Sequence, residues 1–229
     1  MTGTDRGFFY QRHLPHYQPP DSTFSVMFRL AGTLPFEAIQ RLSEERLRYH
    51  QLMRTNTSST EGTKSKRLLK QEQYFRRFDE LLDGYSFGPT WLKQEKIAEL
   101  LSEAIHYRDQ KVYDLLAYCI MANHVHMVFS IEGFGIKSGF EKTSKTGRDS
   151  VPSNTVTDIL GSLKKFTGLR ANKLLRREGA FWQDESCDHV VRENELENAI
   201  WYVLNNPVKA GLVKDWRDWR WTYLKEGVI

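Results

Sequence analysis

An apolar segment from residue 112 to residue 131 most constrains how this chain can fold. Ala122-Asn123 divides it into two runs of strand-forming residues, which predict strands at Val112 to Met121 and His124 to Ile131 joined by a tight turn. Side chains alternate across a strand, so one face of the second strand is expected to enter a core through Val125, Met127, Phe129 and Ile131. The other face then begins with His124 and His126.

The two histidines are candidate metal ligands. On one face of a strand they stand about 7 Å apart at the backbone, so the imidazoles can converge on one ion. Taken alone, a His-x-His pair on a strand is more often two surface or hydrogen-bonded histidines. A metal site therefore needs support from other residues.

Composition sets wider bounds. With 229 residues and 40% hydrophobic content, the chain can form one compact domain, or at most two small ones. A net charge of +4 mildly favours a polyanionic partner. Two cysteines support neither a disulfide framework nor a cysteine zinc site. The chain has no apolar run long enough for a membrane span, and its first 18 residues contain no apolar segment typical of a secretory signal. A cytoplasmic location is therefore expected.

The remaining segments fit a single domain over residues 1–229. Thr23 to Leu30 predicts a first strand, and a helical pattern from Trp91 to Tyr107 leads into the central strands. Between them, residues 37–90 predict a helical insertion of two helices separated by a flexible Ser/Thr-rich loop at 55–66. Residues 132–154 predict a second flexible loop.

A basic helix is predicted from about Val156 to Arg177, capped by Thr155 or Thr157. Its apolar stripe is expected to contain Ile159, Leu160, Leu163, Phe166 and Leu174. No acidic residue occurs between Ile159 and Arg177, so an exposed basic ridge is expected from Lys164, Lys165, Arg170, Lys173, Arg176 and Arg177. Phosphates are the natural counterpart of such a ridge, although a merely solvated basic helix has the same pattern.

The C-terminal part predicts a strand through Val190-Val191 and then a helix from 193–195 to Asn205, ended by Pro207. Residues four apart share a helix face, so Tyr202 and Asn206 should project together. A tyrosine in such a helix is by default a core aromatic. Only its context gives Tyr202 another role.

That context is a family resemblance. The segment 121–126, Met-Ala-Asn-His-Val-His, resembles the HUH signature of the single-tyrosine transposases, and Tyr202 followed by 206–213, Asn-Pro-Val-Lys-Ala-Gly-Leu-Val, resembles the tyrosine helix of their REP-associated branch. Further segments are similar in the same order, at 12–16, 30–35, 162–167 and 181–189. The branch usually has proline where Ala122 stands and an aromatic residue where Cys187 stands.

The resemblance implies a fold, an activity and a site. The fold is an α+β, ferredoxin-like (RRM-like) antiparallel sheet with helices on one face. The activity is cleavage and rejoining of single-stranded DNA at palindromic, REP-like hairpins through a 5′-phosphotyrosine on Tyr202. A divalent ion would be held by His124, His126 and Asn206. Mg²⁺ or Mn²⁺ is expected, because these ions accept oxygen and imidazole ligands. His189 lies in a similar segment and is a further site candidate, although a structural hydrogen bond explains it equally well.

Two other functions stay open on the sequence. One is a non-catalytic hairpin-binding regulator that uses the basic helix and stacked aromatics such as Trp182 and Trp201. The other is a metal-dependent phosphoesterase that uses His124 and His126 with water as the nucleophile. The REP-associated branch favours a monomer, although a dimer is compatible with the sequence.

Overall fold

The structure, a computed structural model, describes residues 8–11, 15–19, 21–35, 37–38, 40–41, 44, 77, 80–82, 88–134 and 155–229. The predicted loop at 55–66 and residues 135–154 of the second predicted loop lie outside these ranges, as does most of the insertion at 37–90. The described positions within 37–44 and 77–82 are helical.

The elements, in chain order, are β1 (Phe8–Gln11), β2 (Pro15–Gln18), β3 (Thr23–Leu30), η1 (Trp91–Lys93), α3 (Glu95–His106), β4 (Asp114–Ile120), β5 (His124–Ser130), α4 (Val156–Leu174), β6 (Trp182–Val191), η2 (Glu193–Glu195), α5 (Leu196–Leu204), α6 (Asn206–Lys209), η3 (Trp216–Asp218) and β7 (Thr222–Leu224). The strand predicted at Thr23 to Leu30 has these bounds in the structure. β4 begins two residues later than predicted, and β6 is longer than the predicted strand around Val190-Val191.

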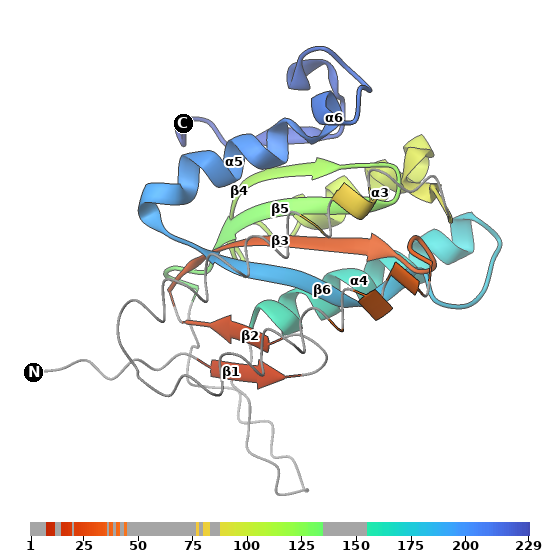
Figure 1. Cartoon of the computed structure of the whole chain (residues 1–229), viewed down its shortest axis with the longest axis horizontal. Coiled ribbons are helices and arrows are strands. Elements are labelled where there is room, and N and C mark those ends of the chain that lie inside the picture. The colour runs from red at the N-terminus through yellow and green to blue at the C-terminus, as the bar shows by residue number, and fades with distance from the viewer. Residues whose placement is uncertain are drawn as a thin grey trace, which may run out of the picture.

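Five antiparallel strands form one sheet in the order β6-β3-β5-β4-β7 (Figure 1). β3, α3, β4, β5, α4 and β6 follow one another as a β-α-β-β-α-β unit, which confirms the predicted ferredoxin-like α+β fold. β5, the strand with the two histidines, is the middle strand, and all of its residues are buried. The hairpin β1-β2 forms a separate small sheet, and β7 extends the main sheet beyond β4.

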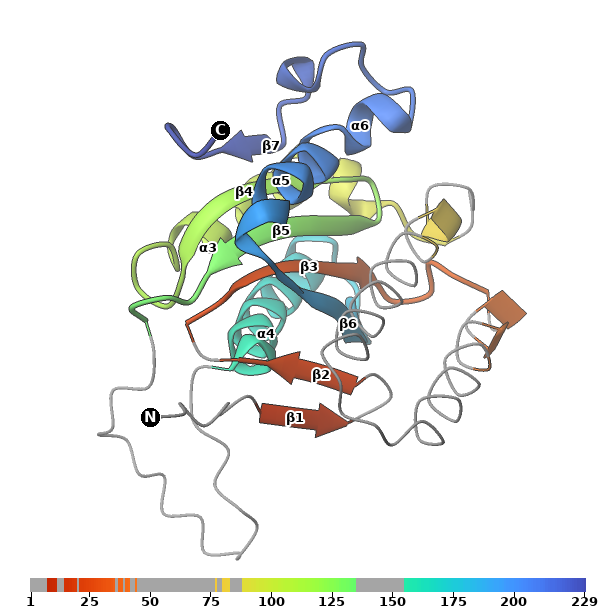
Figure 2. The ribbon, with the colours of Figure 1, turned by 60° about the vertical axis from the view of Figure 1, so that its left-hand side comes forward.

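The two faces of the sheet have different coverings (Figure 2). α3 and α4 pack on one face, against a core that includes Phe24, Phe28, Val125, Met127 and Phe129. The predicted core side of the histidine strand is therefore confirmed. α5 lies on the opposite face, where its side chains pack on residues of β4 and β5, among them Ala117, Cys119 and Val128.

The helix predicted from 193–195 to Asn205 is divided in the structure. A 3-10 turn, η2, precedes α5, and a new short helix, α6, begins at Asn206. Pro207 lies in the first turn of α6, where its missing N–H costs no hydrogen bond. The proline therefore ends one helix and starts the next.

No helix among the described residues is long and apolar enough to cross a membrane. Both cysteines, Cys119 and Cys187, are buried, and they form no disulfide with each other. Burial raises the pKa of the Cys187 thiol to about 12, with further contributions from the charges of Asp188 and Glu185.

Gly88 is expected to be essential for stability. Its φ of +89° favours glycine, and a Cβ at this position would lie 2.2 Å from the carbonyl oxygen of Gly32. We expect Gly88→Ala to lower the free energy of unfolding by more than about 3 kcal/mol, because backbone must move to relieve the overlap. Gly133→Ala is the matched control, since Gly133 has a φ of +74° but no atom of the described residues lies within 4 Å of an added Cβ. That variant should lose only about 1 kcal/mol, and similar losses for both in urea unfolding would contradict the role of the Gly32 contact.

Candidate active site

His124 and His126 lie on the face of the sheet that α5 partly covers. They alternate with Val125 and Met127, which enter the opposite core, and both histidines are almost fully buried. Their rings lie 4.8 Å apart between centroids, nearly perpendicular to each other. The strand geometry therefore brings the two imidazoles together, as the sequence predicts.

The orientation of His124 is set by its neighbour in the turn. Nδ1 of His124 lies 2.7 Å from Oδ1 of Asn123, an amide oxygen that can only accept a hydrogen bond. Nδ1 of a neutral His124 therefore carries the proton, and Nε2 is left with the lone pair that could bind a metal. Ala122, where proline is usual in the resembling branch, does not prevent this turn from closing, because Met121 N–H donates to His124 O at 2.9 Å.

The floor around His126 is formed by sulfur-containing side chains in one row across the sheet. Cys119 on β4 and Met27 on β3 are the direct strand partners of His126, and Cys187 on β6 is the partner of Met27. Directly opposed residues have Cβ atoms about 5 Å apart. The imidazole therefore stands between weakly polar neighbours in a buried row.

Tyr202 approaches the histidines from α5. Its ring lies 6.1 Å from the His126 ring between centroids, at an angle of 80°, although the two residues are 76 positions apart in the sequence. The half-buried ring also packs against a cluster of Met27, Leu34, Leu82 and Cys187. The default interpretation of Tyr202 as a simple core aromatic is thus incomplete, since its ring faces the histidine pair within one chain.

Asn206 is fully buried one helical turn beyond Tyr202. Its Nδ2 donates to the backbone oxygens of Tyr202 at 2.9 Å and Val203 at 3.4 Å, which fixes the amide. Its Oδ1 is buried and has no hydrogen-bond partner among the described residues. A buried amide oxygen without a donor is costly, and a bound cation would satisfy it.

By their chemistry, two imidazoles and an amide oxygen are donors that suit a divalent ion such as Mg²⁺ or Mn²⁺. In the described part of the chain, no three His, Cys, Asp or Glu side chains form a group that could hold a metal. A metal site at this place therefore depends on the amide oxygen of Asn206 in addition to the two imidazoles. Such a mixed set leaves coordination positions open for substrate oxygens.

Two cations near the site were not singled out from the sequence. Arg29 on β3 is only 4% exposed and is the direct strand partner of His124. Its guanidinium donates to Thr33 Oγ1 at 3.0 Å. Lys209 on α6 places its Nζ 3.4 Å from the centroid of the Tyr202 ring. Arg29 could have been noticed in the sequence, because it is a charged residue within an otherwise apolar strand. No local sequence pattern distinguishes Lys209 from other lysines.

His189 lies on the same face but apart from the histidine pair. It is the strand partner of Ser25, which in turn pairs with Val128 two residues beyond His126. Two strand spacings, about 10 Å, separate β6 from β5. Its role in the site stays a prediction.

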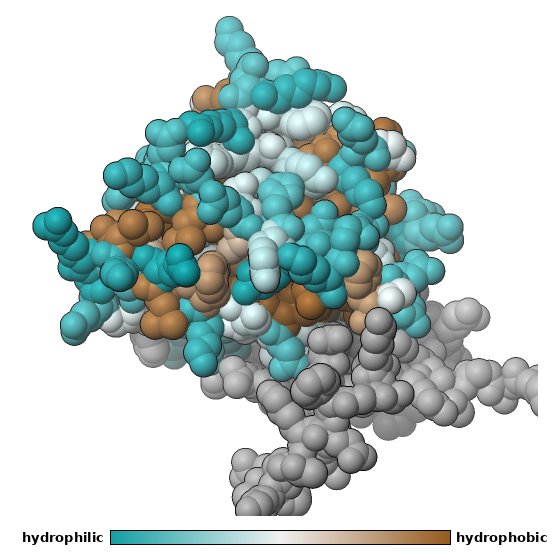
Figure 3. Space-filling model, turned by 180° about the vertical axis from the view of Figure 1, so that it is seen from behind, coloured by the Kyte–Doolittle hydropathy of each residue, from teal (hydrophilic) through white to brown (hydrophobic). Residues whose placement is uncertain are grey.

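The basic residues of α4 lie over the face of the sheet opposite to Tyr202. Lys165, Arg170 and Lys173 on α4 are exposed, as is Arg176 just beyond its end, because the helix ends at Leu174 and not at the predicted Arg177. Figure 3, which views the molecule from behind, shows apolar side chains exposed among polar ones. Phe166 and Leu174, predicted in the apolar stripe, are 39% and 53% exposed, so that prediction is wrong for both. Arg108, in the turn after α3, and Arg170 lie over the Phe166 ring at 5.6 and 4.9 Å, which explains how an exposed phenylalanine is accommodated.

Lys164 and Arg177 differ from the exposed members of the ridge. Lys164 Nζ donates to three backbone oxygens of β6, those of Gln183, Asp184 and Glu185, and to Ser186 Oγ, at 2.7 to 3.2 Å. Burial lowers the pKa of Lys164 to about 8, although the charge of Asp184 opposes the shift. Its expected place on an exposed ridge is wrong, because its ammonium caps carbonyl groups of an edge strand. Arg177 is half-buried and stacks on Trp91 at 3.9 Å.

Trp182 is also buried by α4. It is 8% exposed, and its Nε1 donates to Thr167 Oγ1 at 2.9 Å. Its indole is therefore not available for stacking on a nucleic-acid base. This removes one of the two aromatics suggested for a hairpin-binding regulator.

Two adjacent lysines on α4 give a matched test, because Lys164 is half-buried against β6 and Lys165 is exposed. We expect Lys164→Met to lower the free energy of unfolding by about 2 kcal/mol, because carbonyl groups of β6 lose their donor. The loss should grow between about pH 8, the pKa of Lys164 in the folded protein, and pH 10.5, its ordinary value. In this range the unfolded wild type holds the lysine proton and the folded wild type does not. The free energy of unfolding of the wild type therefore rises with pH, whereas Lys164→Met lacks this gain. Lys165→Met should leave stability unchanged but reduce the salt dependence of DNA binding by about one counterion. Chemical unfolding and salt titration of DNA binding measure the two effects, and the same stability loss in both variants would contradict the assignment.

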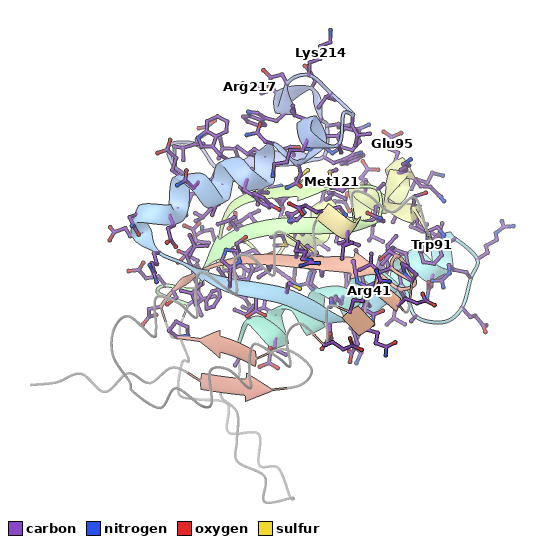
Figure 4. All side chains as sticks on the ribbon, viewed as in Figure 1. Arg41, Trp91, Glu95, Met121, Lys214 and Arg217 are labelled. Carbon is purple, nitrogen blue, oxygen red and sulfur yellow. The ribbon has the colours of Figure 1, made fainter. Side chains whose placement is uncertain are left out.

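Figure 4 shows side chains filling the space between α5 and the sheet, with Met121 close to the end of β4. Met121 belongs to the apolar cluster beneath Ile200, Val203 and Leu204 of α5. This packing holds α5 against β4 and β5. The position of Tyr202 over His126 therefore depends on the core beneath α5.

Comparisons with known proteins agree with the resemblance in the motifs. The chain matches no protein-family model. It is 26% identical over 112 residues to a protein of Haemophilus influenzae named as a REP-associated tyrosine transposase, and the match covers 47% of this chain and 56% of that protein. The chain thus spans only about half the length of this relative. A solved structure described as the REP-associated tyrosine transposase bound to a REP hairpin aligns with a TM-score of 0.42 and 14% identity, over 93% of this chain and 80% of that chain. The similarity over 112 residues confirms that the chain resembles REP-associated tyrosine transposases.

Proposed function

We propose that this chain is a REP-associated tyrosine transposase that cleaves and rejoins single-stranded DNA at palindromic hairpins, with Tyr202 as the nucleophile. The observation that carries the proposal is the approach of the Tyr202 ring to His126, at 6.1 Å, from a different element of the same chain. A tyrosine beside two buried histidines and a buried amide oxygen is the set of groups that this reaction requires. The name of the Haemophilus influenzae relative, a REP-associated tyrosine transposase, supports this class of enzyme.

His124 through Nε2, His126, and Asn206 through Oδ1 would hold a divalent ion, Mg²⁺ or Mn²⁺. When bound, the ion would polarise the scissile phosphate and offset its developing negative charge. The tautomer of His124 and the buried Oδ1 of Asn206 support these three residues as the ligands. The protein contributes their orientation through Asn123 and through the backbone of α5.

The chemical step is a transesterification. A bond forms between Tyr202 Oη and phosphorus while the bond from phosphorus to the 3′ oxygen breaks. The phenolic proton leaves to water, and the departing 3′ oxygen takes a proton from water. The phosphotyrosine conserves the energy of the broken bond, so a 3′ hydroxyl can attack it in the reverse sense and rejoin the strand.

Contacts within one chain support a site that a single chain forms. His126 and Tyr202 contact each other through their rings, and Asn206 is hydrogen bonded to the backbone of Tyr202. A monomer is therefore the proposed active form. The exposed basic residues of α4 would bind DNA phosphates on the other face of the sheet.

A covalent adduct assay tests this function. The purified chain is incubated with a labelled oligonucleotide containing a palindromic repeat from the neighbourhood of its gene, with and without Mn²⁺ or Mg²⁺. We expect protein attached to a 5′ phosphate and a product with a free 3′ hydroxyl, both dependent on the metal. Cleavage without any adduct would indicate water as the nucleophile, and tight hairpin binding without cleavage would indicate a non-catalytic regulator. Either result would refute the proposed reaction.

A further inference from the structure

Lys209 occupies one face of the proposed nucleophile. Its Nζ lies 3.4 Å from the centroid of the Tyr202 ring, which is close contact for a cation and an aromatic face. His126 approaches the same ring at 80°, with 6.1 Å between centroids. The phenol therefore lies between an imidazole of the sheet and an ammonium group of α6.

The position of Lys209 follows from the short helix that begins after α5. Lys209 N–H donates to Asn205 O at 2.9 Å, and Ala210 N–H donates to Asn206 O at 3.0 Å, so this turn is well ordered. Gly211, with a φ of +68°, ends it. One turn of chain thus presents both the buried amide of Asn206 and the ammonium of Lys209 toward Tyr202.

Lys209 is the cation that the described structure places on the tyrosine ring. His126 on β5 and Cys187 on β6 are titratable groups of the described residues that also pack near the ring. The Cys187 thiol carries no charge at neutral pH, because burial raises its pKa to about 12. Neither group supplies the fixed positive charge that a lysine does.

We propose that Lys209 is a positioning residue, which holds the Tyr202 ring toward the scissile phosphate and offsets the negative charge that develops on the phenolic oxygen during attack. The inference rests on the proposed function, because it assigns a partner to the same nucleophile. An aromatic ring attracts a cation through its electron-rich face, and this attraction strengthens as the phenol loses its proton. The step takes no proton from Lys209, so the bonds formed and broken are those given above for the transesterification.

Single-turnover adduct formation with saturating oligonucleotide tests the role. Lys209→Met keeps the length of the side chain but removes the charge, and we expect the rate constant to fall about ten- to a hundred-fold. Lys209→Arg should retain at least about a third of the wild-type rate, because arginine can also stack on the ring. Lys214→Met is the control, since Lys214 is an exposed lysine near the same end of the chain. The dissociation constant of DNA should change less than about threefold in all three variants.

A double-mutant cycle on stability gives a readout that does not need catalysis. Unfolding is measured for Lys209→Met, Tyr202→Leu and the double variant, and we expect coupling between the two positions. Three outcomes would each overturn the proposal. Lys209→Met could react at the wild-type rate, Lys209→Arg could lose as much rate as Lys209→Met, or the stability effects of the two positions could be additive. If the wild-type chain forms no adduct, the proposed function fails, and the cycle still decides whether Lys209 holds the ring.

Discussion

Tyr202→Phe should abolish the covalent attachment of the chain to DNA. Phenylalanine preserves the ring that packs against Met27, Leu34 and Leu82, and it preserves the ring contact with His126. Only the oxygen that would bond to phosphorus is lost. Phenylalanine cannot form the phosphotyrosine bond, so we expect adduct formation and cleavage to fall by at least about a thousand-fold.

The measurement is denaturing gel electrophoresis of protein and labelled oligonucleotide, with DNA binding and thermal unfolding followed in parallel. Binding and unfolding temperature should remain close to wild type, because the change removes one oxygen from a half-buried side chain. Tyr223→Phe is the control. Tyr223 belongs to β7 and stacks on Tyr118 at 5.6 Å, within the cluster of the opposite face. Cleavage that persists in Tyr202→Phe would assign the attack to water or to another side chain.

The sheet could be predicted because its signals are local. Alternation of apolar side chains in β3 and β5 gave the strands and the buried faces, and the turn at Ala122-Asn123 set the hairpin. The short strand β7 has only three residues and lies among tryptophans, so alternation gives no comparable signal. The small hairpin β1-β2 likewise was not predicted from the sequence pattern.

The errors on α4 have a common physical cause. A helical stripe shows which residues share a face, but the sheet beneath α4 covers only part of that face. Phe166 therefore stays exposed between Arg108 and Arg170, whereas Thr167 and Gly168 are buried. Lys164 appears in sequence as one more basic residue, yet its long side chain reaches carbonyl groups of β6 about twenty positions away.

The site was predictable in its residue types but not in its assembly. The spacing of His124 and His126 on one strand places them together, and the resemblance supplied Tyr202 and Asn206. That α5 would lie over β5 depends on apolar packing with β4, which a single sequence does not specify. Lys209 depends further on the new helix that starts at Asn206, so no local pattern could place it over the tyrosine ring.

His126→Leu should remove both metal binding and cleavage. Leucine fills much of the imidazole volume between Met27 and Cys119, but it has no donor for an ion. Loss of one of three ligands should reduce adduct formation by at least about a hundred-fold. Wild-type protein at about a hundred times the metal dissociation constant should gain about 2.7 kcal/mol of stability, and this gain should disappear in the variant.

Thermal unfolding with and without Mn²⁺ measures that difference directly, because each variant is compared with itself. A gain of this size corresponds to roughly 5 to 10 °C for a chain of this length. His106→Ala is the matched control, since His106 is exposed at the end of α3 and contacts Tyr118 and Tyr223 on the other face. It should retain the metal-dependent shift and the adduct. A shift that survives in His126→Leu would place the ion elsewhere, and the buried Oδ1 of Asn206 would then need another partner.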